Sequence, residues 1–359
     1  MLEVAYKIVA QILLARLKVI KESKEHLDHE NQCGFRNGRG CSDGSFTVKA
    51  LLSKRREHNR ETWVLFLDLV KAFDMVPREL LWNTLERFGV PLKLISILRA
   101  MHKSIEVLFE VDGLKRRLSS TIGVKQGDLL GPELFTFYMA GVMETWRAGH
   151  DYNFCKLRTR EDFILTGRNP NTGGKNVFGK QYTEFAVSDS EYADDTAIPF
   201  CNRADAEKYT PLLIEHFRRW GLEVHAGSYH PFKGSKTELL FCSRPLSTYQ
   251  DPSTCDNTDM TDLILPNGRF VPVVTKFKYL GSYISSDGSD TIDVQSRIDS
   301  AARAFGALSK CIFRSQNIDR KAKSAIYESL ILSICLYGCE SWCLTEKLYS
   351  KLRQFHARC

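Results

Sequence analysis

Two adjacent carboxylates, Asp194 and Asp195, interrupt a stretch that is otherwise apolar and β-prone. Like charges a few ångströms apart repel one another and raise each other's pKa, so such a pair at a hairpin tip is unfavourable. A bound divalent cation would neutralise it. Asp is also a common turn residue in any protein, and a solvated turn explains the same pattern. Taken alone, the motif leaves the metal site and the plain turn equally open.

A third carboxylate, Asp68, favours the metal site. It follows the short apolar run 63–67, and a helix start at Pro77 comes soon after, so we expect the run to be a buried strand. Asp68 would then lie at the carboxyl end of a strand, where open α/β sheets place their chemistry. Two Mg²⁺ ions about 3.5–4 Å apart, shared by carboxylates, activate an attacking oxygen and stabilise a leaving one. Aspartyl-phosphate chemistry is disfavoured, because it needs a second Asp where Val70 stands.

Seven ordered blocks of sequence carry a resemblance to a known family. They are residues 32–40, 68–74, 123–132, 192–195, 221–222, 236–238 and 277–281, which read QCGFRNGRG, DLVKAFD, GVKQGDLLGP, YADD, GL, KTE and FKYLG. In this order they resemble the reverse transcriptases of non-LTR (LINE-type) retrotransposons, over nearly the whole chain. Each block alone is a weak signal, whereas seven in the same order are specific.

The resemblance implies an α+β fold, the right-hand polymerase fold with an antiparallel-sheet palm, partial fingers and a helical thumb. The expected boundaries are 1–60 for the fingers, 61–285 for the palm with a fingers segment 78–122 and an inserted loop 150–183, and 286–359 for the thumb. In the family, a strand and a basic fingertip hairpin precede the segment that corresponds to residues 4–22, and the family continues beyond Cys359. The chain is therefore expected to be truncated at both ends.

Roles for individual residues also follow from the resemblance. The metals, Mg²⁺ or Mn²⁺, would be held by Asp68, Asp194 and Asp195 with the carbonyl of Leu69. Phe73 would be the steric gate for the nucleotide, although plain core filling is compatible with the same position. Gln126 would contact the sugar, and Gly127 would let the base pair settle against the main chain. Lys236 is a candidate general acid or charge neutraliser beside the departing pyrophosphate, with an ordinary surface lysine as the alternative.

The activity implied is RNA-directed DNA synthesis, in which a primer 3′-hydroxyl attacks a dNTP. The implied partners are an RNA template, a DNA primer and other segments of a longer retroelement protein, including an endonuclease. The basic loop 34–40, with Arg36 and Arg39, would meet template phosphates, and a plain turn is its alternative. A remnant that binds RNA or an RNA–DNA hybrid without polymerising is the competing function, motivated by the absent fingertip.

Composition agrees with an intracellular nucleic-acid-binding protein. The 359 residues, 43% of them hydrophobic, suffice for a sizeable core and more than one subdomain. A net charge of +7 fits a nucleic-acid partner. The 11 cysteines lack paired spacing over most of the chain, which favours a reducing compartment over a disulfide framework. No apolar run spans a bilayer, so we expect no membrane partner and a place in the nucleus, the cytoplasm or both.

The sequence also predicts four local features. A helix from Pro77 to Gly89 should turn Leu80, Leu81, Leu85 and Phe88 inward. Pro211 should kink a helix over 204–220 or delay its start. Glu191, where the family usually has an apolar residue, adds charge beside the metal site, and would either weaken the strand or be harmless if it pointed outward. A C-terminal set, Cys335, Cys339, Cys343, His356 and Cys359, fits core packing better than zinc.

Overall fold

The computed structural model describes residues 4–23, 31–103, 105–124, 127–150, 155–161, 181–243 and 260–359. The sheet at its centre has the strand order β13-β10-β1-β7-β6. These strands are β1 (Thr62–Leu67), β6 (Ser190–Tyr192), β7 (Asp195–Phe200), β10 (Glu238–Cys242) and β13 (Val273–Val274). Strand β1 pairs antiparallel with β7 and β10, and only the short β10–β13 contact in this sheet is parallel. The expected α+β class with an antiparallel palm sheet is confirmed.

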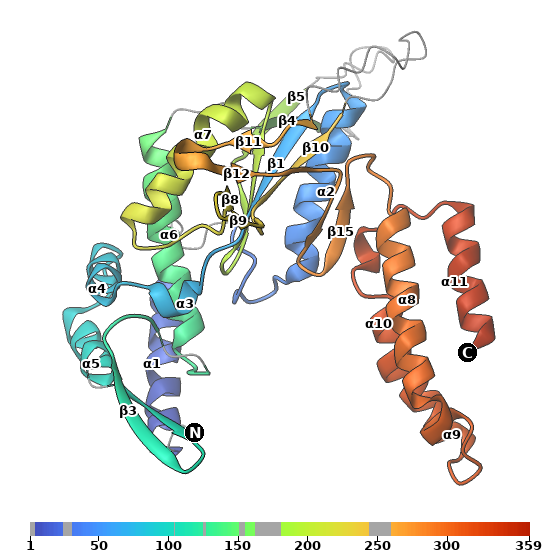
Figure 1. Ribbon diagram of the computed structural model, residues 1–359, viewed down its shortest axis with the longest axis horizontal. Helices are drawn as coiled ribbons and strands as arrows, with labels where there is room; N and C mark the ends of the chain where they lie inside the picture. The colour runs from blue at the N-terminus through green and yellow to red at the C-terminus, as the bar shows by residue number, and fades with distance from the viewer. Residues whose placement is uncertain are drawn as a thin grey trace, which may run out of the picture.

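Strand β1 is buried along its whole length because both of its faces are covered (Figure 1). Trp63, Leu65 and Leu67 join the main core with helices α6 (Gly131–Gly149) and α7 (Arg203–Arg219). Val64 and Phe66 face the other way, toward helix α2 (Cys41–Glu57) and the hairpin β14 (Lys276–Tyr279)–β15 (Ser282–Ser285). A strand alternates its side chains between the two faces of a sheet, so an all-apolar strand serves two cores at once.

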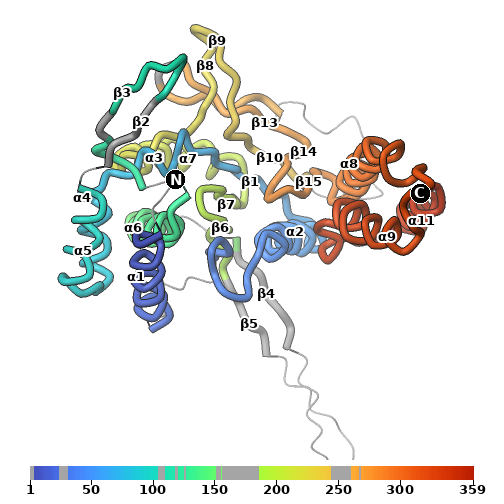
Figure 2. The backbone as a smooth tube through the Cα atoms, turned by 90° about the horizontal axis from the view of Figure 1, so that it is seen from below, coloured from blue at the N-terminus to red at the C-terminus, as the bar shows by residue number. Residues whose placement is uncertain are grey.

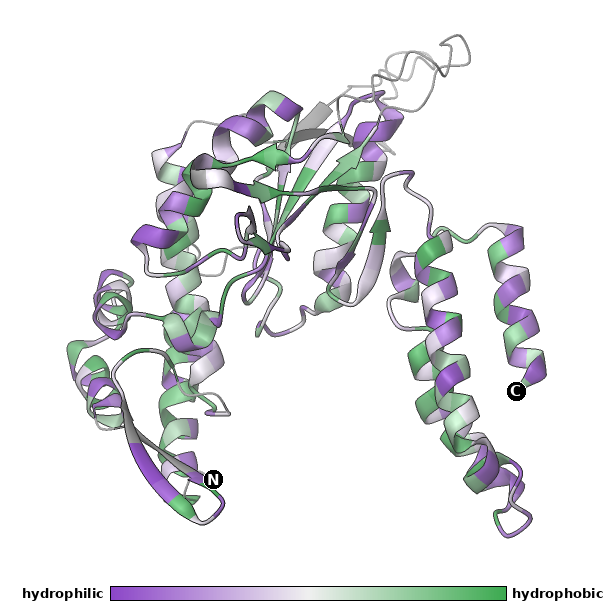
Figure 3. Ribbon diagram, viewed as in Figure 1, coloured by the Kyte–Doolittle hydropathy of each residue, from purple (hydrophilic) through white to green (hydrophobic). Residues whose placement is uncertain are grey.

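A second group of elements lies beside α6 at one end of the palm (Figures 1 and 2). It contains α1 (Val4–Glu22), α3 (Ala72–Met75), α4 (Arg78–Arg87), α5 (Leu92–His102) and the hairpin β2 (Ile105–Val111)–β3 (Leu114–Ser120). Figure 3 shows the hydrophilic character of β3, which carries the exposed cluster 115–117. In α4, Leu81 and Leu85 are fully buried, but Leu80 is 37% exposed. The inward orientation expected for Leu80 is wrong, because the buried face of α4 is formed by Leu81, Trp82, Thr84 and Leu85.

The remaining strands lie in smaller sheets. They are β4 (Cys155–Glu161) with β5 (Gln181–Val187), and β8 (Gly227–Tyr229) with β9 (Phe232–Lys233), β11 (Leu263–Ile264) and β12 (Arg269–Val271). The inserted loop expected over 150–183 thus begins and ends in paired strands, and residues 162–180 lie outside the described part of the chain. Helix α7 starts at Arg203 and runs through Pro211. A late start is therefore wrong for this helix.

The C-terminal residues form a helical bundle that stands apart from α1, α4 and α5 on the opposite side of the molecule (Figure 1). Its helices are α8 (Thr291–Leu308), α9 (Arg320–Ile326), α10 (Ser333–Cys335) and α11 (Glu346–Arg358). Ala301, Ile331, Cys335 and Phe355 form its small buried core. Cys343 and Cys359 are exposed, so they do not share the packing of Cys335. None of the helices within the described ranges is both long and apolar enough to cross a membrane.

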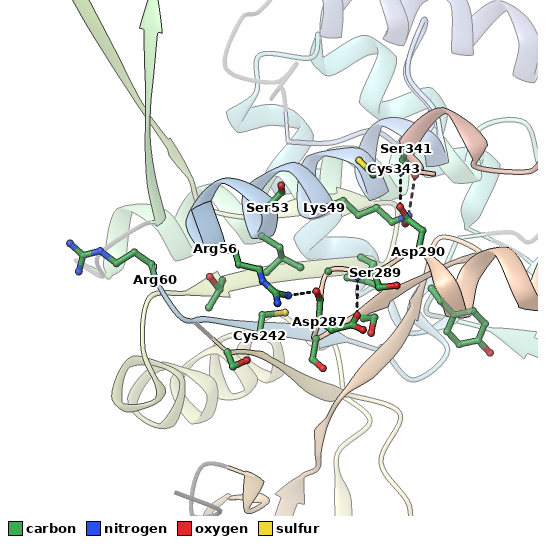
Figure 4. A pocket seen from close by; sticks show the side chains of 18 residues that line it. Lys49, Ser53, Arg56, Arg60, Cys242, Asp287, Ser289, Asp290, Ser341 and Cys343 are labelled. Carbon is green, nitrogen blue, oxygen red and sulfur yellow. Dashed lines mark hydrogen bonds and ion pairs between the residues drawn. The ribbon is translucent and has the colours of Figure 1, made fainter. Parts of the chain in front are cut away.

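Lys49 of α2 joins this bundle to the palm (Figure 4). Its Nζ lies 2.8 Å from Asp290 Oδ1 and 3.8 Å from Asp293 Oδ2, at the start of α8. The same two carboxylates accept hydrogen bonds from the backbone N–H of Cys343 at 2.7 Å and from the indole N–H of Trp342 at 2.8 Å. Buried charges are stable only when paired and hydrogen-bonded, and every charge in this cluster meets that condition.

Candidate active site

The pairing of β1 with β7 brings the three acidic residues of the sequence motifs to one place. In the antiparallel register Leu67 is opposite Thr196, so the next positions, Asp68 and Asp195, leave the pair side by side. Asp194 precedes β7 in the tight turn from β6, where Tyr192 is opposite Asp195. The side chain of Asp68 is 35% exposed. The three carboxyl groups therefore lie near one another at the ends of strands β1 and β7, where water can reach them.

These carboxyl groups are close enough to affect one another's pKa. Partial burial raises the pKa of Asp194, and the nearby charge of Asp68 raises it further. Partial removal from water, with the charges of Asp194 and Asp68, raises the pKa of Asp195 to about 6. Mutual repulsion of this kind is typical of sites that concentrate negative charge for a function.

A divalent cation fits this donor set. Oxygen ligands from carboxylates are those that Mg²⁺ prefers, and the ion keeps several waters and substrate phosphate oxygens in its shell. Among the described residues, no group of three or more His, Cys, Asp or Glu side chains is arranged to hold a metal ion, at the motif or in the C-terminal bundle. An open site of two or three carboxylates is what a metal shared with a phosphate substrate requires.

Lys236 supplies a positive charge beside the carboxylates. Its Nζ lies 3.8 Å from Asp68 Oδ2, although 67% of the side chain is exposed. The next residue, Thr237, is fully buried, and its Oγ1 accepts a hydrogen bond from the backbone N–H of Asp68 at 3.2 Å. The carbonyl of Asp68 accepts a bond from the N–H of His225 at 2.8 Å. The segment after α7 thus fixes the backbone of Asp68 and places the lysine near it.

The residues expected at the nucleotide lie on the segment that crosses from β1 to α6. The ring of Phe73 stacks on Phe135 with centroids 4.2 Å apart and is half-buried. The Phe73 carbonyl accepts a hydrogen bond from Val124 N–H at 2.9 Å, which brings the 123–132 block against α3. Gly127 has a φ of +78° and open space where a Cβ would be. Gln126 lies outside the described residues.

Leu69 follows Asp68 as an isolated bridge partner of Val224, and its side chain is 7% exposed. Further along the segment, Gly123 has a φ of +79°, and a Cβ there would lie 2.5 Å from the carbonyl oxygen of Asp74. Only glycine tolerates both conditions. Arg78, which no sequence pattern singled out, is buried and donates to the carbonyls of Gly123 and His102, each at 2.9 Å. Its guanidinium holds the 120–123 segment in place below Phe73.

Glu191 points inward, so the expectation that it could point harmlessly outward is wrong. Its Oε1 lies 2.8 Å from Arg147 of α6, which also pairs with Asp189. Burial, with the negative charge of Asp189 beside it, raises the pKa of Glu191 well above the usual value. For Asp189, burial is outweighed by Arg147, and its pKa is lowered. Arg147 therefore contacts both carboxyl groups, and their pKa values are shifted in opposite directions.

The sequence and the fold are similar to those of known polymerases. The family model described as reverse transcriptase (RNA-dependent DNA polymerase) matches residues 1–284. The Pol polyprotein of the type-2 retrotransposable element R2DM of Drosophila melanogaster is 30% identical over 115 residues, which are 32% of this chain and 11% of that protein. The uncharacterized 149 kDa protein of transposon TX1 of Xenopus laevis is 31% identical over 137 residues, or 38% of this chain and 10% of that protein. The chain thus spans about a tenth of the length of these relatives.

Among solved structures, a telomerase of Candida albicans with a fragment of telomeric RNA has a TM-score of 0.44 at 10% identity, over 97% of this chain and 54% of that chain. A telomerase of Candida tropicalis has a TM-score of 0.42 at 15% identity, over 78% of this chain and 44% of that chain. The family model covers most of the sequence and all seven ordered blocks that predicted a retrotransposon enzyme. The chain belongs to the reverse transcriptase family.

Proposed function

We propose that this chain is the core of an RNA-directed DNA polymerase that transfers a nucleotide from a dNTP to a primer 3′-hydroxyl. The main support for this is that Asp68, Asp194 and Asp195 lie near one another at the ends of strands β1 and β7, where water can reach them. Their carboxylates, with the Leu69 carbonyl, would hold Mg²⁺, or Mn²⁺ in its place. When bound, a pair of such ions activates the attacking hydroxyl and stabilises the pyrophosphate that leaves.

The chain's own side chains would orient the reactants around this centre. Lys236, close to Asp68, can neutralise charge on the departing pyrophosphate or donate a proton to it. Phe73 would lie beneath the sugar and exclude a 2′-hydroxyl, the group that distinguishes ribonucleotides. Its ring is held by Phe135, so it cannot easily move aside. The Gln126–Gly127 pair would contact the sugar and seat the new base pair, because a glycine lets the substrate approach the backbone.

The proposed nucleic-acid partners are an RNA template and a DNA primer. The basic loop 34–40 adjoins the catalytic turn, since the ring of Phe35 lies 6.3 Å from that of Tyr192. Arg39 is exposed on this loop and is suited to template phosphates. We assign 1–60 and 78–122 to fingers, the rest of 61–285 to palm, and 286–359 to thumb. Other segments of a longer retroelement protein, including an endonuclease, would complete the reaction.

Primer extension with the purified chain tests the polymerase assignment. The wild type should extend a DNA primer on an RNA template with dNTPs and Mg²⁺. Asp194→Asn should lower the rate by more than about 100-fold, because even residues that only support a metal ligand contribute 10–100-fold. Asp299→Asn, which changes a carboxylate on α8, is the matched control and should extend normally. Binding of template without any extension by the wild type would instead identify a remnant that binds RNA or a hybrid.

Phe73→Ala tests the sugar gate. Removing the ring should let the chain incorporate ribonucleotides, so that the ratio of kcat/KM values for dNTP and rNTP falls by about tenfold or more. Incorporation of each nucleotide on the same template measures this ratio. Phe135→Leu, which loosens the ring's support without removing the ring, is the control and should shift the ratio less. Unchanged selectivity in Phe73→Ala would leave Phe73 with a packing role only.

A further inference from the structure

We propose that Gln32 is a positioning residue that fixes the backbone of the turn carrying Asp194 and Asp195. The inference rests on the proposed function, because it assigns the residue that holds the metal-binding turn in shape. Gln32 belongs to a segment that the sequence assigns to the template through its glycines and arginines. The structure instead places its side chain, 8% exposed, directly behind the catalytic hairpin.

The side-chain carbonyl of Gln32 accepts two backbone hydrogen bonds. The N–H of Ala193 lies 3.1 Å from Oε1, and the N–H of Gly34 lies 2.7 Å from the same atom. A Cβ on Gly34 would lie 2.6 Å from the Ala193 nitrogen and 2.9 Å from Oε1. The two backbones and the amide are therefore packed closely against one another.

The backbone of Ala193 needs this support. Its φ of +58° is in the left-handed region, which is disfavoured for any residue with a Cβ. Such a conformation persists only where the surroundings over-determine it. Ala193 is 4% exposed, so its N–H has no access to bulk water. Asp194 is the next residue, and a rotation of the Ala193 peptide would carry its carboxylate away from Asp68.

The orientation of the Gln32 amide is set from its other end. Its Nε2 donates to Glu191 Oε2 at 3.3 Å, and the partner carboxyl oxygen of Glu191 is held by Arg147 at 2.8 Å. The backbone on both sides is tied as well, because Cys33 N–H donates to the Glu191 carbonyl and Glu191 N–H donates to that of Asn31, each at 2.8 Å. Glu191 is thus the donor's partner, which leaves the carbonyl of Gln32 to face the turn.

Reversing the polarity of this pair gives a sharp test. Gln32→Leu removes both acceptor bonds. Gln32→Glu keeps an acceptor for Ala193 but loses the donor to Glu191. In the double variant Gln32→Glu/Glu191→Gln, the new Gln donates to the new Glu, and its carbonyl still accepts from Arg147. Gln354→Leu, which removes an exposed amide on α11, is the matched control.

Two readouts are measured without catalysis: the amide resonance of Ala193 in ¹⁵N-alanine-labelled protein, assigned by its loss in Ala193→Gly, and Mn²⁺ affinity by electron paramagnetic resonance. Gln32→Leu should shift the Ala193 resonance and weaken Mn²⁺ binding by about 10-fold or more. The double variant should recover both values to within about threefold of the wild type, whereas Gln32→Glu should not.

An unshifted Ala193 resonance in Gln32→Leu, an unchanged Mn²⁺ affinity, or a double variant no better than Gln32→Glu would overturn the proposal. If Gln32→Leu does not fold, the comparison between Gln32→Glu and the double variant decides the same point. In primer extension the loss should fall on kcat, with the KM for dNTP unchanged. If Gln32→Leu shows the expected changes in the Ala193 resonance and in Mn²⁺ affinity but the wild type extends no primer, the proposed function is refuted and the positioning role still holds.

Discussion

Two acidic clusters lie on the same hairpin and differ in how their charges are balanced. Asp189 and Glu191, at the start of β6, are buried and are met by Arg147, Asn31 and Gln32. Asp194 and Asp195, at its end, have raised pKa values because of partial burial and the nearby charge of Asp68. The buried cluster pairs its negative charge with a cation, whereas the carboxyl groups at the turn between β6 and β7 raise one another's pKa.

The largest effect should come from breaking the balanced cluster. Arg147→Leu leaves the charge of Asp189 buried without its partner, and should lower the free energy of unfolding by about 3–5 kcal/mol. Urea denaturation measures this. Arg218→Leu is the matched control, because Arg218 pairs with Glu215 at 2.7 Å on the surface, and exposed pairs contribute at most about 1 kcal/mol. Equal losses in both variants would mean that the buried pair is no different from a surface pair.

A smaller loss is expected where the thumb joins the palm. Lys49→Met leaves Asp290 and Asp293 with their hydrogen bonds to Cys343 and Trp342 but without their cation. The free energy of unfolding should fall by about 1–3 kcal/mol, the range for removing one partner of a buried polar group.

Lys54→Met is the control, because it removes a surface pair with Glu57 on the same helix and should change stability little. Thermal unfolding of Lys49→Met and Lys54→Met measures the loss of stability in each. A Lys49 variant as stable as that control would show that the N–H donors alone satisfy the two carboxylates.

The smallest effect concerns the unbalanced cluster and has the opposite sign. The pKa of Asp195 is raised from 3.8 to about 6, so the folded state binds more protons than the unfolded state between these values. The contribution of Asp195 to stability is therefore greatest at low pH and is lost as the pH rises through this window. Because the side chain is exposed, screening limits the loss to about 1 kcal/mol or less. Asp195→Asn should raise stability at pH 8 by that amount.

Denaturation at pH 4 and pH 8 measures the difference, which should shrink in Asp195→Asn. Mg²⁺ should stabilise the wild type at pH 8 through the same carboxylates, and this gain should be smaller in the variant. Asp262→Asn, at a site remote from the motif, is the control. A variant that is less stable than the wild type at pH 8 would mean that Asp195 supports the fold rather than opposing it.

Signals within the chain were enough to predict the family and several of the helices and strands. Periodicity and apolar runs predicted the strand that is β1 and the helices that are α1, α4 and α5, because those signals depend on neighbours in the chain. The inward orientation predicted for Leu80 of α4 was wrong, and of the two alternatives at Pro211, a kink or a late start, the late start was wrong, because both depend on what packs alongside. The carboxyl-end rule that singled out Asp68 belongs to parallel sheets, whereas this palm is antiparallel.

How these elements meet depends on contacts between segments that are far apart in the chain. The register of β1 with β7 places Asp68 beside Asp195, although 126 residues lie between them in the chain. The order of residues alone does not specify this pairing. Likewise Glu191 finds Arg147 on α6, and Gln32 finds the N–H of Ala193. Residue type tells which charges and amides a chain carries. Whether each is paired or left open depends on contacts between distant segments, which exist only once the two cores around β1 have packed.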